Sequence, residues 1–117
     1  MRKILLYIIL FLSSIDGVRA LPIEKEGMSI YSPALKKEVS YSIILPEGYE
    51  HSDMEYPVLY MFHGIGGDYT SWLEYGNVAR IMDQMTKKGE IQPFIIVIPD
   101  GYLSYYSDTY DGSFPYE

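Results

Sequence analysis

In this chain of 117 residues, the segment Val58–Gly67, VLYMFHGIGG, is the strongest indicator of the fold. Val58–Phe62 is an unbroken apolar run, which is typical of a β-strand that is buried on both faces. His63–Asp68, HGIGGD, follows the run directly, and we call this segment the glycine turn. Because open α/β sheets bind ligands beyond the carboxyl ends of their strands, the glycine turn is placed where such a protein does its chemistry.

A helix is predicted downstream of the glycine turn, over residues 77–88. Apolar side chains recur there at helical spacing and form one stripe, made of Val78, Ile81, Met82 and Met85. Asn77 suits the N-cap, and Gly89 suits the left-handed residue that ends a helix. The segment therefore indicates an amphipathic helix that packs on a sheet.

Phe94–Ile98, FIIVI, predicts a second buried strand, which Pro99 and the residues after it end. The order strand, glycine turn, helix, strand is that of a βαβ unit, whose strands are parallel. Upstream, Ser29–Ser32 and Val39–Leu45 alternate apolar and polar residues and predict two more strands. The fold class is therefore α/β, with an incomplete and mostly parallel sheet.

Composition excludes several classes of protein. The 48% content of hydrophobic residues is that of a core-forming chain rather than a disordered one. Residues 21–117 hold six basic and fifteen acidic side chains, a net charge of −9. Nucleic acid is therefore not an expected partner, because phosphate contacts need clustered Lys and Arg. There is no Cys, which excludes thiolate zinc sites and disulfides.

Residues 1–20 are typical of a cleaved export signal. Arg2 and Lys3 precede the apolar run Ile4–Leu12, and Val18–Ala20 offers small residues for signal peptidase. The run is shorter than the roughly 20 residues that span a bilayer, so a stable membrane anchor is the weaker interpretation. We expect cleavage near Ala20, a secreted or periplasmic location, and one domain over residues 21–117.

The glycine turn has two interpretations on its residues alone. Glycines directly after a buried strand let backbone N–H groups face a ligand, and such donors can stabilise the negative charge of an oxyanion. The alternative is a sharp turn between strand and helix without chemistry. A phosphate cradle is disfavoured, because neither a Gly-Lys-Ser/Thr sequence nor G-x-G-x-x-G spacing is present.

Tyr56–Gly67 resembles the esterase family related to esterase D, whose members have the α/β-hydrolase fold and include feruloyl and acetyl-xylan esterases. Ile44–Tyr49, ILPEGY, is similar to the family's preceding strand and turn, and Pro93–Gly101, PFIIVIPDG, is similar to its next strand. Tyr105–Asp108 resembles the segment that leads to its next helix. The resemblance covers nearly all of residues 28–117 and implies the N-terminal part of an α/β-hydrolase domain.

The resemblance implies one catalytic group. In the family the residue after His-Gly supplies a backbone N–H to the oxyanion hole, and that position is Ile65 here, in a loop formed with His63, Gly64, Gly66 and Gly67. No G-x-S-x-G pentapeptide occurs, and the family's serine, acid and histidine follow the segment matched here. We therefore interpret His63 as a residue that shapes the turn rather than as the triad base.

The loop after residue 101 is rich in tyrosine. Tyr105, Tyr106 and Asp108 are candidate substrate-binding residues, because in the family this loop borders the cleft and tyrosine rings can stack on sugars or phenols; ordinary packing is the alternative. Asp108 and Asp111 miss the spacing of a calcium loop, so no metal is expected. No cofactor is expected either.

Two functions follow from these residues. The first is the N-terminal part of a secreted serine carboxylic-ester hydrolase, inactive alone, whose substrate is an ester-bearing small molecule or the acetyl or feruloyl esters of plant polysaccharide. The second is a secreted carbohydrate-binding or interaction protein without catalysis. The sequence predicts only one clear helix, so one apolar face of the sheet would stay uncovered. We therefore expect residues 21–117 alone to aggregate or bind hydrophobic dye and to melt without cooperativity. Oligomeric state stays open.

Overall fold

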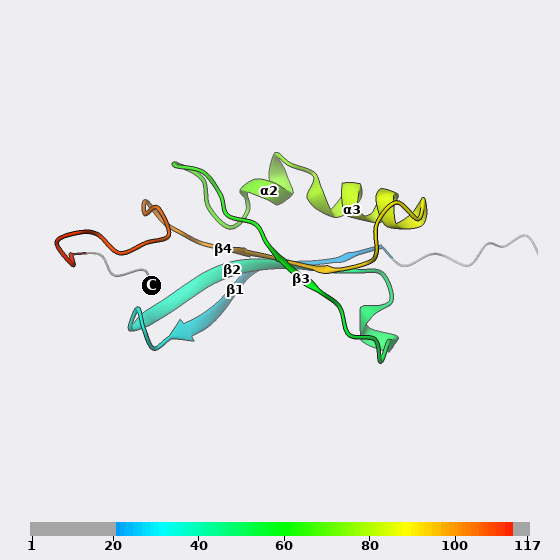
Figure 1. Cartoon of the computed structure of the whole chain (residues 1–117), viewed down its shortest axis with the longest axis horizontal. Helices are drawn as coiled ribbons and strands as arrows, with labels where there is room; N and C mark the ends of the chain where they lie inside the picture. Colours follow the sequence, from blue (N-terminus) through cyan, green and yellow to red (C-terminus); the bar gives the residue numbers. More distant parts are fainter. Residues whose placement is uncertain (1–20, 114–117) are drawn as a thin grey trace, which may run out of the picture.

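The computed structural model describes residues 21–113, and the predicted export signal lies outside them. Four strands form one sheet in the order β1-β2-β4-β3, namely β1 (Ile23–Ser32), β2 (Lys37–Leu45), β3 (Val58–Tyr60) and β4 (Ile95–Pro99). The helices α2 (Ser71–Glu74) and α3 (Val78–Lys87) lie on one side of this sheet (Figure 1). A short 3₁₀ turn, η1 (Tyr49–His51), lies in the loop between β2 and β3.

The βαβ unit predicted from the glycine turn is present. β3 and β4 are parallel, with Val58 opposite Ile95 and Tyr60 opposite Val97, and α3 lies between them in the chain. The other two pairings, β1 with β2 and β2 with β4, are antiparallel. The described sheet is therefore mixed, and the expectation that it is mostly parallel is wrong for these residues, because β2 joins β1 through a hairpin and runs against β4.

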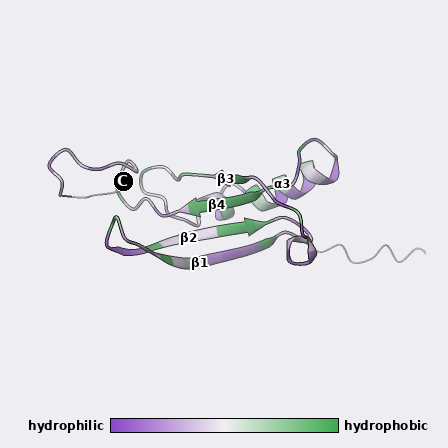
Figure 2. Cartoon of the chain, turned by 60° about the horizontal axis from the view of Figure 1, so that its bottom comes forward, coloured by the Kyte–Doolittle hydropathy of each residue, from purple (hydrophilic) through white to green (hydrophobic). Residues whose placement is uncertain are grey.

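The core lies between the sheet and α3. Its buried residues come from β2, β4 and α3, and they are Ile44, Ala79, Met82, Ile96 and Ile98. The polypeptide is strongly apolar along β3, β4 and the second half of β2, whereas β1 is mostly polar (Figure 2). Apolar burial between α3 and these strands is therefore the main stabilisation of this part of the chain.

Burial on both faces of the two apolar strands, predicted from their sequences, is not observed. In β4 only the alternate residues Ile96 and Ile98 are buried, and all three residues of β3 are exposed. The physical reason is that α2 and α3 cover one face, whereas β3 is an edge strand of the described sheet. The expected uncovered face is thus present within residues 21–113.

Helix α3 matches its prediction in extent, with two differences. Asn77 occupies the N-cap, but with φ of 54° and no side-chain capping bond, so only its carbonyl serves the helix by accepting from Ile81 N–H. Ala79 and Met82 are buried, whereas Ile81 is 45% exposed, so the buried face is rotated relative to the predicted stripe. Gly89 has φ of 73° and ends the helix as expected.

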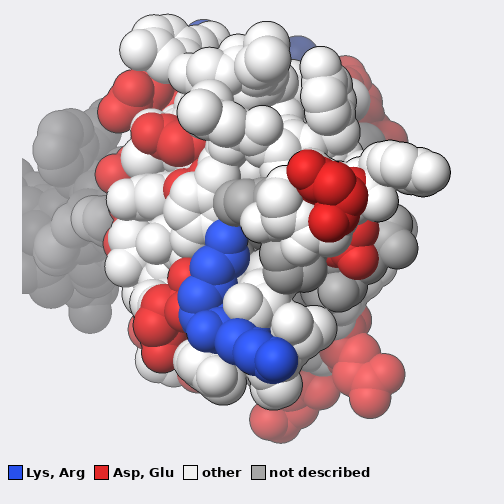
Figure 3. Space-filling view, turned by 90° about the vertical axis from the view of Figure 1, so that its left-hand side faces the viewer, with Lys and Arg blue, Asp and Glu red and all other residues white. Residues whose placement is uncertain are grey.

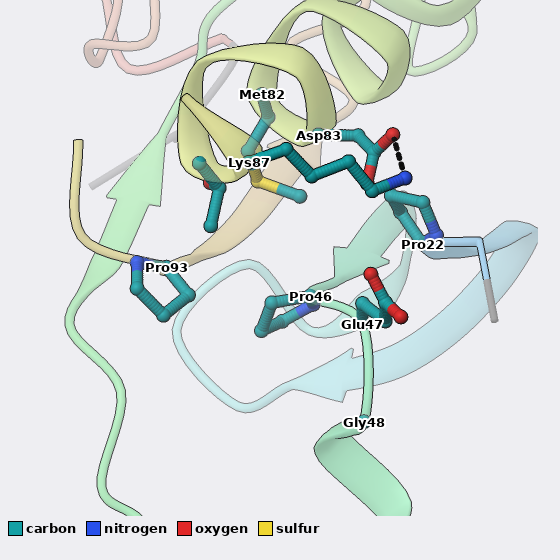
Figure 4. A pocket seen from close by; sticks show the side chains of 9 residues that line it. Pro22, Pro46, Glu47, Gly48, Met82, Asp83, Lys87 and Pro93 are labelled. Carbon is teal, nitrogen blue, oxygen red and sulfur yellow. Dashed lines mark hydrogen bonds and ion pairs between the residues drawn. The ribbon is translucent and has the colours of Figure 1, made fainter. Parts of the chain in front are cut away.

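The two ends of the sheet differ in what lies beside them: the glycine turn lies at one end and a hollow at the other. The carboxyl ends of β3 and β4 meet the start of β2 and the glycine turn. At the opposite end a hollow of about 320 Å³ lies under α3, and the side chain of Met82 points into it (Figure 4). Its walls include Pro22, Pro46 and Pro93, and an ion pair joins Asp83 to Lys87 at 2.7 Å.

Candidate active-site turn

The backbone of the glycine turn is bent by a four-residue reverse turn. Gly67 N–H donates to the carbonyl of Gly64 at 3.0 Å, and Gly66 has φ of 77° at the third position, the pattern of a type II turn. Gly67 is favoured by close approach, because a Cβ there would lie 2.8 Å from Ser71 Oγ and 3.2 Å from Gly64 O. Glycine is therefore favoured at position 66 by the positive φ and at position 67 by the close approach of neighbouring atoms.

Ile65 occupies the second position of this reverse turn. Its side chain is 83% exposed, and within residues 21–113 its N–H donates to no protein acceptor. The reverse turn is closed by Gly67, so it does not use this donor. An unused N–H at the carboxyl end of a sheet strand is the kind of group that can stabilise an anionic oxygen.

His63 is buried at the base of the turn, and its side chain is only 1% exposed. Gly101 N–H donates to Nε2 at 2.9 Å, so Nε2 is an acceptor and the ring proton lies on Nδ1, which donates to Gly64 O at 2.9 Å. Nε2 also lies 3.3 Å from Asp100 Oδ1, but a neutral ring with this tautomer donates nothing there. The nitrogen that a general base would use is therefore already engaged by the backbone of Gly101.

Asp100 and Tyr106 complete a polar network around His63. Asp100 is buried and accepts the N–H of Tyr102 at 2.8 Å. The hydroxyl of Tyr106 accepts the N–H of His63 at 3.0 Å. We call these contacts of His63, Asp100, Gly101 and Tyr106 the His63 network. It joins the end of β3 to the end of β4 across about forty residues of chain.

The second half of the glycine turn is held to α2. Asp68 Oδ1 accepts both the N–H and the hydroxyl of Thr70 at 2.7 Å, and Asp68 N–H donates to Ser71 Oγ at 2.9 Å. The hydrogen bonds from Thr70, its hydroxyl first and then its N–H, lower the pKa of Asp68 below its usual value. Trp72 adds a bond from Nε1 to Phe62 O at 2.9 Å, so α2 fixes both sides of the turn.

Two hollows flank the glycine turn. One of about 500 Å³ is lined by Gly66, Gly67, Asp68, Asp100, Tyr102, Leu103 and Lys37. The other, of about 250 Å³, is lined by His63, Gly64, Ser71, Trp72, Tyr75 and Gly76. Figure 3 looks onto this end of the molecule, where basic side chains form one narrow stripe between acidic ones. The turn therefore stands between two open spaces rather than in a packed core.

The three predicted substrate-binding residues are not brought together. Tyr105, 86% exposed, and the exposed Asp108 line a hollow of about 390 Å³ in the loop after β4. Tyr106 instead faces the glycine turn, and burial, the largest cause, raises the pKa of its hydroxyl. Substrate binding by these residues stays a prediction.

Sequence reasoning missed the contacts of Asp100 and Tyr106 with His63. The first was within reach, because the carboxyl ends of two neighbouring parallel strands meet at one edge. The second depends on how an irregular loop folds back, for which no periodic pattern exists.

Among the described residues no cluster of three or more acidic or histidine side chains could hold a metal ion. No helix in residues 21–113 is long and apolar enough to cross a membrane.

The mixed sheet with its βαβ unit, and the turn at its carboxyl end, define an α/β fold of the α/β-hydrolase type. The model of the family described as "Putative esterase" matches residues 32–115, and the chain belongs to that family. A curated relative, the endo-1,4-beta-xylanase/feruloyl esterase of Xylanibacter ruminicola, is 35% identical over 80 residues, which are 65% of this chain and 11% of the relative.

Solved structures agree with this assignment. A ferulic acid esterase superposes with a TM-score of 0.65 at 31% identity, covering 68% of this chain and 31% of its own. The ferulic acid esterase of Anaeromyces mucronatus, solved in complex with ferulic acid, gives 0.62 at 31% identity and covers 80% of this chain and 34% of its own. The chain thus spans about a third of the length of these structures.

Proposed function

We propose that residues 21–117 supply the oxyanion-turn part of a secreted serine carboxylic-ester hydrolase that acts on feruloyl or acetyl esters of plant polysaccharide. The carrying observation is the position of Ile65 in a reverse turn at the carboxyl end of β3, where its N–H donates to no acceptor within residues 21–113. Membership of the esterase family and the likeness to feruloyl esterases support the reaction class.

The chemistry assigned to Ile65 is electrostatic. When a serine oxygen attacks the ester carbonyl, the carbonyl oxygen becomes an oxyanion, and a preorganised N–H donates to it more strongly than to the neutral ester. One such donor contributes roughly 10² to 10³ in rate. In this proposal the serine, its base and the acid are supplied by polypeptide outside residues 1–117, and the serine's neighbour supplies the second donor.

The His63 network supports this role. Its hydrogen bonds anchor the residue that precedes Gly64 and Ile65, so the donor stands on a fixed backbone rather than on a free loop. Preorganisation matters because a donor that must reorient during the reaction loses much of its benefit. The same bonds keep His63 itself from acting as the base.

Export is part of the proposal. The layout of residues 1–20 supports cleavage near Ala20 and release from the cytoplasm. An extracellular or periplasmic esterase can reach polysaccharide, which supports feruloyl or acetyl polysaccharide esters over a cytoplasmic thioester. N-terminal sequencing of the exported protein is expected to begin at Leu21, and a retained Met1 would contradict export.

The test is made on the protein encoded by the same reading frame followed past codon 117, which we call the continued chain. We expect a G-x-S-x-G sequence and then an acid and a histidine, and hydrolysis of methyl ferulate or an aryl acetate that residues 1–117 alone do not catalyse. A continued chain without that serine, or one that hydrolyses neither ester, would refute the proposal. A cooperative thermal melt and sugar binding by residues 21–117 alone would favour the non-catalytic alternative.

A further inference from the structure

The loop after β4 folds back so that one tyrosine reaches the glycine turn. Tyr106 Oη accepts the N–H of His63 at 3.0 Å, and it lies 3.5 Å from the carbonyl of Pro99, at the long limit of a hydrogen bond. Its hydroxyl thus contacts the backbone at the ends of both β3 and β4. Residues 63 and 106 are 43 positions apart, so this contact is tertiary and specific to the folded chain.

The ring of Tyr106 is held in place by three neighbours. Its centroid lies 4.5 Å from that of Phe62 and 5.5 Å from that of His63. It also covers Gly101, where a Cβ would lie within 2.8 Å of Cε2 and closer still to two other ring atoms. The backbone of Tyr106 has φ of 58°, a left-handed conformation that a bulky residue rarely adopts without tertiary support.

Neighbouring tyrosines do not share this environment. Tyr105 is 86% exposed and Tyr110 is fully exposed, although both belong to the same loop. Tyr106 therefore differs from Tyr105 and Tyr110, because it is less exposed and its hydroxyl contacts the backbone of His63.

We infer that Tyr106 is a positioning residue, which fixes the peptide of His63 and thereby the direction of the Ile65 N–H two residues later. This inference rests on the proposed oxyanion role of Ile65. Tyr106 itself touches no reacting atom and acts through the backbone. Burial raises the pKa of its hydroxyl above the ordinary value of 10.0, so the group is protonated near neutral pH and can donate toward Pro99 while it accepts from His63.

The test is Tyr106→Phe in the continued chain, because phenylalanine keeps the ring contacts and removes only the hydroxyl. The matched control is Tyr31→Phe on β1, whose tyrosine is 56% exposed. We expect kcat for methyl ferulate to fall about 5- to 10-fold, with KM changed less than twofold, because one neutral hydrogen bond is lost and the donor is less well aimed. The control should keep both constants.

A second readout does not depend on activity. Amide hydrogen exchange of the peptide that spans residues 61–65 should become about 5-fold faster in Tyr106→Phe and stay unchanged in Tyr31→Phe. A purely structural role would lower the melting temperature and leave kcat of the folded protein unchanged, and that result overturns the inference.

The two readouts separate this inference from the proposed function. If the continued chain is inactive, the proposed function fails, and hydrogen exchange alone decides whether Tyr106 fixes the turn. If the continued chain is active and Tyr106→Phe has wild-type kcat and exchange, the inference fails while the proposed function stands.

Discussion

The carboxyl end of the sheet and the opposite end are stabilised in different ways. At the carboxyl end, hydrogen bonds that involve His63 and Tyr102 join residues 38 to 64 positions apart. At the opposite end, prolines and Met82 surround a hollow, and the ion pair Asp83–Lys87 spans a single helical turn. Hydrogen bonds are directional and orient individual backbone groups, whereas the hydrophobic effect is non-directional. The comparison indicates that side chains at the carboxyl end hold backbone groups in one orientation.

The largest expected change in stability comes from the opposite end. Met82 is 3% exposed, and Met82→Ala removes a buried side chain from the core, at a cost of about 3 kcal/mol in the free energy of unfolding. Urea unfolding of the continued chain measures this loss. Because Met82 lines the hollow at the end of the sheet opposite the glycine turn, kcat of the folded protein should stay at the wild-type value. A fall in kcat without a fall in stability would break the comparison.

The second prediction pairs two glycines. Gly101→Ala places a methyl group against the ring of Tyr106, and we expect about 2 to 3 kcal/mol of destabilisation together with a lower kcat. Gly48→Ala, at the opposite end, meets no atom within 4 Å but has φ of 78°, so it should cost about 1 to 2 kcal/mol and leave kcat unchanged. Equal effects of the two variants on kcat would show that the His63 network has no special role.

Sequence alone predicted much of the fold and less of the site. The βαβ unit, the extent of α3 and the position of the glycine turn follow from local signals, because apolar runs and glycines act within a few residues. The exposed edge at β3 could not be predicted from Val58–Phe62, because burial depends on which other elements cover a strand. The contact of Tyr106 with His63 could not be predicted either, because an irregular loop without a periodic pattern makes it.

The smallest expected effect is electrostatic and concerns Asp68. Its pKa is lower in the folded protein than the ordinary value of 3.8, so its bonds to Thr70 stabilise the fold above about pH 4 and are lost as the pH falls through the folded value. Asp68 is exposed, so solvent screening limits the gain to about 0.5 kcal/mol. The difference in unfolding free energy between wild type and Asp68→Asn should shrink between pH 5 and pH 3, values chosen to bracket the ordinary value. A difference that is constant with pH would contradict the assignment.

A comparison of Ile65→Pro with Ile65→Ala in the continued chain shows whether the N–H of Ile65 stabilises an oxyanion. Proline suits the second position of a type II turn, so it removes the N–H while keeping the bend. Alanine keeps the N–H and shortens a side chain that is already exposed. We expect kcat to fall roughly 10²- to 10³-fold in Ile65→Pro, with KM little changed, and to stay near wild type in Ile65→Ala. Equal kcat values for the two variants would contradict this role of the N–H.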